Sequence, residues 1–575
     1  MTVKIQEGKF QMTNLLSQAK NQLEEMIRSA LGRCIQSGAL AAEPIPAFQI
    51  EIPGDTSHGD FASNIAMVSA RAFHLAPRKI AEEIQRELQF AGTYFERCEI
   101  AGPGFMNFFI SKDWFADVLK GVGTDGDQYG RSDFGGGKKV MVEFVSANPT
   151  GPMHIGNARG GAIGDCLASV LDWAGYDVTR EFYVNDAGNQ INKFGLSLSV
   201  RYRQLFLGED QVELPADAYQ GKDILEHAKR FAALNGDQYL SCDEETRQKA
   251  LVNYALPINI ANLKEDLGKY RIHYDVWFLE STLHEQGEVL KCIERLKENG
   301  YTYEEDGTIF YKATAFGAEK DDVLVRSNGI PTYFAADIAY HYNKFAVRGF
   351  DKVINIWGAD HHGHVARLKG AMDAIGLDGS RLDIVLMQLV KLMRDGQPVK
   401  VSKRTGKSIT LVDLLDEVPI DAARFFFNLR EANSQMDFDL DLAVETSSEN
   451  PVYYVQYAHA RICSILKKLA GEGKVLNNFS DCDFTMLTQP EEKELIRYIA
   501  TLPEEIIEAA KAYDPARITR YVISLATLFH KFYNACRVDN DDIALTMARL
   551  GLCTCVKTVL SNVLHMLKID APEKM

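Results

Sequence analysis

The stretch Val140-Met-Val-Glu-Phe-Val145, followed by Ser146-Ala-Asn-Pro-Thr-Gly-Pro-Met-His-Ile-Gly-Asn157, decides how the rest of the chain is organised. Its first part is an apolar run of strand-forming residues, and the Pro and Gly of its second part exclude regular structure there. Residues with the spacing of one helix face then follow: Ile163, Cys166, Leu167, Val170, Leu171 and Ala174, with Gly175 as the C-cap. We predict a strand, a loop and a helix beginning near His154. Its free N–H groups and positive dipole end would face the loop, an arrangement typical of a polyphosphate site.

Length and composition indicate a large soluble protein. A chain of 575 residues is too long for one core, and roughly four domains are expected. No apolar run approaches the about 20 residues of a membrane span and the N-terminus has no signal-peptide core, so we expect a cytoplasmic protein outside the membrane. Ten cysteines without a Cys-x-x-Cys motif indicate reduced core residues rather than structural zinc. The net charge of −16 argues against indiscriminate binding of DNA or other nucleic acid, but leaves room for a local basic face.

The N-terminal region reads as a small α/β domain. Helical spacing runs from Met12 to Leu31 and is ended by Gly32, and Ile80 to Leu88 make another helix face. Phe48–Ile52 and Phe105–Ile110 are expected strands. The segment from Gly121 to Lys139 is rich in glycine and reads as a linker.

The middle of the chain is expected to hold a doubly wound parallel sheet. Thr179–Val184 is a second parallel strand, since a strand–helix–strand order needs a crossover. The polar, helical segment from about 196 to 274 reads as an insertion between two halves of the sheet, the second half beginning near Asp275. It includes a strand from Val353 to Trp357 that stops at Gly358, and this tip should face the His154 loop because ligands lie beyond the carboxyl ends of such strands.

A hairpin and a helical region are expected to follow. Leu389–Arg394 and Gln397–Lys400 flank Asp395-Gly396, a strong hairpin signal. Thr410 and Asp413 are placed to form a capping box at a helix start. From Asp421 onward the pattern is helical almost to the end.

Several runs resemble one family. His154-Ile-Gly-Asn157 resembles the His-x-Gly-His element of class I aminoacyl-tRNA synthetases, and Glu143–Pro152 resembles the signature of arginyl-tRNA synthetases in particular. Other runs are similar to the same family: His58–Ile65, Ala101–Asn107, Asn185–Gln190, Asn450–Arg461 and the terminal Ala571–Met575, where Lys574 replaces a usual Arg. The resemblance implies a small α/β tRNA-contacting domain at 1–122, a Rossmann-like α/β catalytic domain at 123–409 with its insertion at about 196–274, and an all-α stem and anticodon-binding bundle at 410–575.

Lys400-Val-Ser-Lys403 resembles the Lys-Met-Ser-Lys loop of class I synthetases, with Val401 in place of Met. A solvated basic loop is the alternative, but two phosphate elements in the expected order argue against it. The resemblance implies catalytic roles for His154, Asn157, Lys400 and Lys403, and an ATP site made of these residues with Gly156, Gly358, Asp360 and Ser402. Asn157, where His is commoner, can donate a hydrogen bond but cannot carry charge. Mg²⁺ should arrive with ATP.

A guanidinium substrate requires a fork of carboxylates. The resemblance assigns arginine binding to Glu143, Ser146, Asn148, Tyr333 and Asp337, although an isolated acid is more often a surface group or a cap. His361, His362 and His364 invite a metal site, but their spacing is not a helical His pair and no further ligand is evident. We predict no fixed metal site.

The helix after Asn450 carries aromatic residues suited to stacking on single-stranded bases. Family resemblance implies tRNA contacts for Tyr453, Tyr454, Gln456, Tyr457 and Arg461. A tyrosine-rich helix packed within its own bundle is the alternative.

The expected activity is that of an arginine–tRNA ligase, a monomer acting on L-arginine, ATP and tRNA(Arg). Two alternatives remain. A stand-alone nucleotidyl transferase of the same superfold would not need the helical C-terminal region, and a catalytically silent RNA-binding paralogue would show loss of His154, Gly156, Lys400 or Lys403, none of which is lost.

Overall fold

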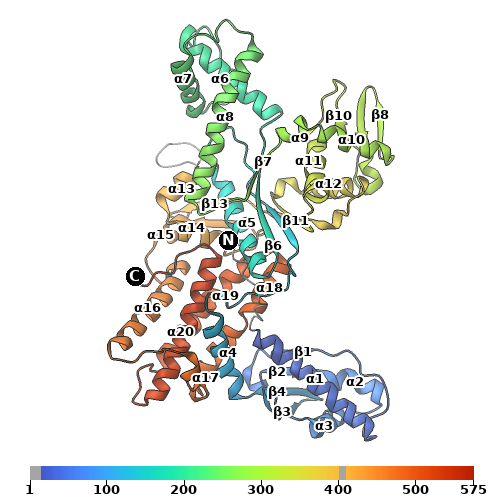
Figure 1. Ribbon diagram of the computed structural model, residues 1–575, viewed down its shortest axis with the longest axis vertical. Helices are drawn as coiled ribbons and strands as arrows, with labels where there is room; N and C mark the ends of the chain where they lie inside the picture. Colours follow the sequence, from blue (N-terminus) through green and yellow to red (C-terminus); the bar gives the residue numbers. More distant parts are fainter. Residues whose placement is uncertain (1–13, 400–408) are drawn as a thin grey trace, which may run out of the picture.

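The computed structural model describes residues 14–399 and 409–575, and its first part is an antiparallel sheet flanked by helices. The four strands are arranged in the order β1-β2-β4-β3 at one end of the molecule (Figure 1). Its elements are α1 (Leu15–Gln36), β1 (Ile50–Glu51), β2 (Phe61–Ser63), α2 (Ile65–Phe73), α3 (Pro77–Glu87), β3 (Phe95–Ala101), β4 (Phe105–Ile110) and α4 (Lys112–Asp125). The predicted end of the first helix at Gly32 is wrong. Leu31 and Cys34 are both fully buried, so packing carries α1 past the glycine.

The linker predicted from Gly121 is wrong in its first part, because α4 continues to Asp125. A Cβ on Gly123 would lie 2.4 Å from Cγ of Phe479. The glycine therefore allows close packing of α4 against the C-terminal region rather than flexibility.

The central sheet confirms the doubly wound prediction. Its five strands are all parallel and lie in the order β12-β11-β5-β6-β7. The strands are β5 (Lys139–Glu143), β6 (Asp177–Val184), β7 (Val276–Leu279), β11 (Lys352–Gly358) and β12 (Leu382–Met387). The strand order reverses between β5 and β11, so the crevice beyond their carboxyl ends is where a ligand is expected.

Both faces of this sheet are covered. Val140 and Val142 of β5 pack in the same core as helix α5 (Ile155–Trp173), whereas Met141 joins Val353 and Leu382 in a separate core on the other face. Helix α5 begins one residue after His154, as predicted. It is buried on all sides from Ala158 to Leu171 rather than on one face, because C-terminal helices cover the side that the sheet leaves open.

The prediction that the helical insertion separates the two halves of the sheet is wrong. β6 pairs directly with β7, so the insertion lies within the first half, and the second half begins at β11 rather than near Asp275. The insertion has its own small core and stands at the other end of the molecule (Figure 1); its helices are α6 (Asn189–Leu207), α7 (Lys222–Asn235) and α8 (Glu244–Lys269).

A second segment between β7 and β11 was not predicted. It contains an antiparallel sheet in the order β10-β9-β8. Its elements, with the helix after β11, are α9 (Ser281–Glu285), α10 (Glu288–Glu298), β8 (Thr302–Glu305), β9 (Thr308–Tyr311), β10 (Asp322–Val325), α11 (Tyr333–Tyr342), the π-helix η4 (Asn343–Val347) and α12 (His362–Ala374).

The predicted hairpin and capping box are confirmed. β13 (Val390–Arg394) and β14 (Gln397–Val399) pair antiparallel around Asp395 and Gly396, both with positive φ. Thr410 and Asp413 cap α13 (Leu411–Glu417) reciprocally. β13 also pairs with β15 (Met436–Asp439), a strand inside the region expected to be helical.

The remaining C-terminal elements are helices: α14 (Ile420–Phe427), α15 (Leu440–Val444), α16 (Pro451–Gly471), α17 (Pro490–Ala500), α18 (Leu502–Ala512), α19 (Ala516–Ala535) and α20 (Ile543–Met566). By length and composition α20 alone among the described helices could cross a membrane. It packs against α16, α19 and α4 (Figure 1), and 61% of its apolar window is buried, which is typical of a core helix.

Candidate active site

The backbone turns sharply where β5 ends. Val145 and Ser146 have φ values of 70° and 42°, a left-handed conformation that β-branched residues rarely adopt. The turn brings the Ser146 hydroxyl to Glu143, where it donates to Oε1 at 3.0 Å, while the backbone N–H of Tyr183 donates to Ser146 Oγ at 3.2 Å. The strained turn thus fixes Ser146 between the tips of β5 and β6.

The start of α5 is joined to the segment that follows residue 408. His154 forms a bridge with Thr410, and the N–H of Leu411 donates to the carbonyl of Met153 at 3.0 Å. The N–H of Ile155 donates to the carbonyl of Ile409. The sequence led us to expect this N–H to be free, and it is not. Lys400, Ser402 and Lys403 lie outside the described residues.

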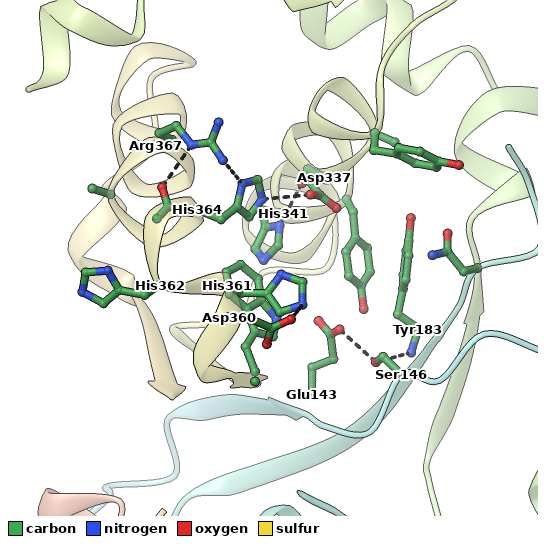
Figure 2. Close-up of a pocket in the computed structure, with 18 of the residues that line it drawn as sticks. Glu143, Ser146, Tyr183, Asp337, His341, Asp360, His361, His362, His364 and Arg367 are labelled. Atoms are coloured by element: carbon green, nitrogen blue, oxygen red, sulfur yellow. Dashed lines mark hydrogen bonds and ion pairs between the residues drawn. The ribbon is translucent and has the colours of Figure 1, made fainter. Parts of the chain in front are cut away.

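A cavity of about 1050 Å³ opens beyond the carboxyl ends of the sheet strands. It brings together seven residues predicted to bind arginine or ATP: Glu143, Ser146, Asn148, Tyr333, Asp337, Gly358 and Asp360. In Figure 2 Glu143 and Asp337 reach the cavity from opposite sides, from β5 and α11, with Tyr183 beside them. His154, Gly156 and Asn157 are outside its lining, at the start of α5.

Asp337 is held by a neutral imidazole. His364 Nε2 lies 3.0 Å from Asp337 Oδ2, and Arg367 donates to His364 Nδ1 at 3.3 Å (Figure 2). Because a guanidinium can only donate, Nδ1 must accept and Nε2 must carry the proton that Asp337 receives. This hydrogen bond orients the carboxylate without neutralising it.

Glu143 has a cation of its own. Lys344, whose side chain is fully buried, places Nζ 2.5 Å from Glu143 Oε2 and donates to Asn355 Oδ1 at 3.2 Å. The charge of Glu143 is therefore already balanced inside the protein, and the arginine-binding role expected for this residue stays a prediction.

Glu280 is a cavity residue that we did not predict. It follows β7 directly, and its side chain is only 3% exposed. Burial raises the pKa of Glu280 to about 7; a hydrogen bond from Tyr183 opposes the rise, and Asp337 and Asp186 add to it. The sequence does show an acid directly after a short apolar strand, Val276–Leu279, and this signal could have found Glu280. It does not show that this strand pairs with β6.

The comparisons with known proteins identify the family. Residues 122–463 match the family described as tRNA synthetases class I (R), catalytic domain. The arginine–tRNA ligases of Caldanaerobacter subterraneus subsp. tengcongensis and Acetivibrio thermocellus are 57% and 54% identical over 564 residues, covering 98% of this chain and all of each relative.

The chain belongs to the arginyl-tRNA synthetase family.

Other parts of the chain match the same family. Residues 21–110 match the arginyl tRNA synthetase N terminal domain, and residues 455–575 match the DALR anticodon binding domain. The solved arginyl-tRNA synthetase of Thermus thermophilus shares the fold, with a TM-score of 0.73 at 21% identity over 97% of this chain and all of that one.

On helix α16 most of the predicted tRNA-contacting residues share a face. Tyr457 is 41% exposed, stacks on Tyr453 and receives a hydrogen bond from Arg461 at 3.4 Å. Tyr454 contacts His530 of α19 and donates to Thr527 at 3.3 Å. Gln456 departs from the prediction: its amide donates to Asp421 at 2.8 Å and to the Asp570 carbonyl at 2.9 Å, so it faces the protein.

The histidines at positions 361, 362 and 364 have three different environments. His361 pairs with exposed Asp360 at 3.7 Å, His362 is exposed, and His364 serves Asp337. Within residues 14–399 and 409–575 no group of three or more His, Cys, Asp or Glu side chains could hold a metal ion.

Proposed function

We propose that this protein joins L-arginine to the 3′ end of tRNA(Arg). In the first step the arginine carboxylate attacks the α-phosphorus of ATP, forming arginyl-adenylate and releasing pyrophosphate. In the second, a hydroxyl of the terminal ribose attacks the activated carbonyl and AMP leaves. The observation that carries the proposal is a pair of acids, the buried Glu280 and the half-buried Asp337, in a cavity at the switch point of a class I synthetase sheet.

Asp337 and Glu280 are the fork for the guanidinium. Asp337 accepts a hydrogen bond from His364, and burial raises the pKa of Glu280, whose ion-pair partner among the described residues is His284 at 3.5 Å rather than a lysine or an arginine. A planar guanidinium would supply the missing charge and two parallel hydrogen bonds. Tyr333, whose hydroxyl accepts from the Asn189 N–H at 2.7 Å, closes the rim.

Glu143, Ser146 and Asn148 face the amino-acid end of the substrate. They follow β5 and lead into the loop before α5, so the reacting carboxylate would lie toward the start of that helix. Asn148 accepts from Asn185 at 3.2 Å, which fixes its amide with the oxygen toward β6.

ATP would lie between β11 and the start of α5. Gly358 and Asp360 are placed for the nucleoside, and His154, Gly156 and Asn157 for the phosphates. Lys400, Ser402 and Lys403 would act on the leaving pyrophosphate, a role supported by the anchoring of Ile409 and Thr410 beside His154. Mg²⁺ would be bound with ATP. No side chain need act as a nucleophile, and rate would come from alignment and phosphate stabilisation.

The rest of the chain serves the RNA. The exposed Tyr457 and the half-buried Tyr453 and Arg461, with Tyr454 behind them, are suited to stacking on anticodon bases. We propose the division 1–122, 123–409 and 410–575 into a tRNA-contacting, a catalytic and a stem and anticodon-binding region. The protein would act as a cytoplasmic monomer without a membrane or DNA partner.

The test is aminoacylation of transcribed tRNA(Arg) with labelled arginine and ATP. Wild type should charge the tRNA, and charging should need all three substrates. A parallel reaction with tRNA for lysine and labelled lysine is the specificity control. Absence of arginine charging by correctly folded protein would overturn the proposal.

A further inference from the structure

Lys344 is a fully buried lysine, so its positive charge must be compensated inside the protein. Its side chain is 0% exposed and lies in the π-helix that continues α11, the helix of Asp337. Single π-helical turns within α-helices are frequently found at functional sites. Burying an ammonium is costly unless its donors are met.

All three donors of Lys344 have partners. Nζ contacts Glu143 at 2.5 Å and Asn355 at 3.2 Å, and lies 4.0 Å from the centroid of the Tyr340 ring. Asn355 in turn donates to His341 Nε2 at 2.8 Å, and His341 Nδ1 bonds the carbonyl of Asp337 at 2.8 Å. Burial and the Lys344 charge hold the pKa of His341 well below its usual range, so the ring stays neutral. The network therefore carries one positive charge, aimed at Glu143.

The ion pair of Lys344 with Glu143 makes Glu143 electrostatically different from Glu280 and Asp337, two other acids of the cavity. Glu143 can still accept hydrogen bonds, because Ser146 and Lys344 each occupy one lone pair of its two oxygens, but it presents no net charge. A cation such as guanidinium gains most at a buried carboxylate that has no internal partner. Glu280 and Asp337 come closer to that condition than Glu143, because among the described residues their ion-pair partners are histidines, His284 at 3.5 Å and His364 at 3.0 Å, whereas Glu143 is paired with the lysine Lys344.

We propose that Lys344 is a specificity-determining residue that sets the direction in which arginine binds. By neutralising Glu143 it directs the guanidinium to Asp337 and Glu280, and it lets the substrate α-carboxylate lie near Glu143 without repulsion. This inference rests on the proposed function and deepens it. Lys344 touches no reacting atom and acts through Glu143.

The test compares Lys344→Met, Glu143→Gln and the double variant Glu143→Gln/Lys344→Met. The assay is arginine-dependent pyrophosphate exchange with tRNA(Arg) present, with agmatine, which is arginine without its carboxylate, as a competitive inhibitor. In Lys344→Met the unpaired Glu143 should repel the arginine carboxylate. The affinity for agmatine relative to arginine should therefore rise at least about tenfold, and kcat/KM for arginine should fall by at least about 100-fold.

The double variant separates charge from structure. It leaves no buried charge at either position, so it should fold, and its agmatine-to-arginine ratio should return to within about threefold of wild type. A ratio unchanged in Lys344→Met, or a double variant no better than Lys344→Met, would overturn the inference. Should Lys344→Met unfold, Glu143→Gln is compared with the double variant, because Glu143→Gln leaves the Lys344 cation unpaired and able to attract the arginine carboxylate. An agmatine-to-arginine ratio at least about tenfold lower in Glu143→Gln than in the double variant supports the proposal, and equal ratios contradict it. Wild-type exchange is measured alongside, so that a failure of the proposed function is distinguished from a failure of this inference.

Discussion

The backbone N–H of Ile155 donates to the carbonyl oxygen of Ile409 across 3.1 Å. This bond joins the first residue of α5 to the first described residue after position 408. Two segments that are remote in sequence, one carrying His154 and the other following Lys403, therefore meet at the helix start where phosphates are expected.

Gly156 tests whether a phosphate approaches the start of α5. A Cβ added at Gly156 would meet no atom within 4 Å, and Ala favours a helix by up to about 1 kcal/mol over Gly. Gly156→Ala should therefore fold with unchanged or slightly higher melting temperature, yet its KM for ATP should rise at least about tenfold because the methyl group would occupy the approach to the helix start. Exchange kinetics at varied ATP measure this, and an unchanged KM would place the phosphates elsewhere.

Gly164, two turns further along α5, is the matched control. Its Cβ would lie 2.2 Å from Cγ of Phe144, so Gly164→Ala overpacks the contact between helix and sheet. It should cost roughly 1 to 3 kcal/mol of stability by denaturant unfolding. A stable Gly164→Ala would mean that α5 packs less closely on the sheet.

The charge of Asp337 should be required for arginine. Asp337→Asn removes the carboxylate but keeps the shape, and kcat/KM for arginine should fall at least about 100-fold, or roughly 2.7 kcal/mol. KM for ATP should change little. Asp217→Asn, at a side chain that is 78% exposed on the insertion, should behave as wild type. Equal activity of the two variants would remove Asp337 from the arginine site.

The pH dependence of arginine use should report Glu280. Its pKa of about 7 in the empty cavity means that the protonated acid dominates below that pH and cannot pair with a guanidinium. kcat/KM for arginine should therefore fall about tenfold per pH unit below about 7. Glu280→Gln should have a lower but flatter profile over pH 6 to 8. A steep profile retained in Glu280→Gln would assign the titration to another group.

Glu280 should also cost the empty enzyme stability. The folded state keeps a proton that the unfolded chain loses above about 4.5, so the free energy of unfolding should fall as pH rises from about 4.5 to about 7. At pH 8 Glu280→Gln should be more stable than wild type by roughly 2 to 3 kcal/mol, and saturating arginine should narrow the gap. Glu285→Gln, at an exposed acid of helix α9, which begins directly after Glu280, is the control in urea unfolding at pH 5 and pH 8. No gain at pH 8 would show that Glu280 already has a cation.

Tyr457 should contribute to tRNA binding and not to the amino-acid site. Tyr457→Ala removes an exposed ring, and the Kd for tRNA(Arg) should rise about 10- to 100-fold, as expected for the loss of a base stack. KM for arginine should stay constant. Tyr454→Phe, which loses only a 3.3 Å bond to Thr527, should bind tRNA normally. Unchanged binding by Tyr457→Ala would favour a helix that serves only its own bundle.

Local signals predicted local structure well. The apolar run at Val140 and the spacing after His154 predicted β5 and the start of α5, and Asp395-Gly396 and Thr410 predicted a hairpin and a capped helix. These depend on neighbouring residues, whose chemistry the sequence displays directly. The burial of α5 on every side depends instead on the packing of α14 and α18 against it, which the sequence does not show.

The errors share one physical cause. Placing the insertion between halves of the sheet was wrong because strand order is a long-range property, and Glu280 was missed for the same reason. The ion pair of Glu143 with Lys344 was missed because the two residues are 201 positions apart in the chain. Gln456 was expected at the RNA because helical spacing does not say that Asp570 returns to bond it.

The packing of the C-terminal helices on α5 limits what can be learned by removing them. Deletion of residues 450–575 would distinguish a synthetase from a stand-alone nucleotidyl transferase only if the catalytic region folded alone. Helices α18 and α20 pack directly on α5, so the deletion would expose the helix at whose start we propose that ATP binds. Tyr457→Ala makes the same distinction in the intact chain.

The most direct measurement is pyrophosphate exchange with tRNA(Arg) present, offering arginine, lysine, ornithine and citrulline in turn. A cavity built on Asp337 and Glu280 should support exchange with arginine and reject uncharged citrulline by at least about 10⁴-fold, because citrulline would bring no positive charge to the buried Glu280 or to the half-buried Asp337. Exchange with citrulline at a rate comparable to arginine, or with none of the four, would contradict the account.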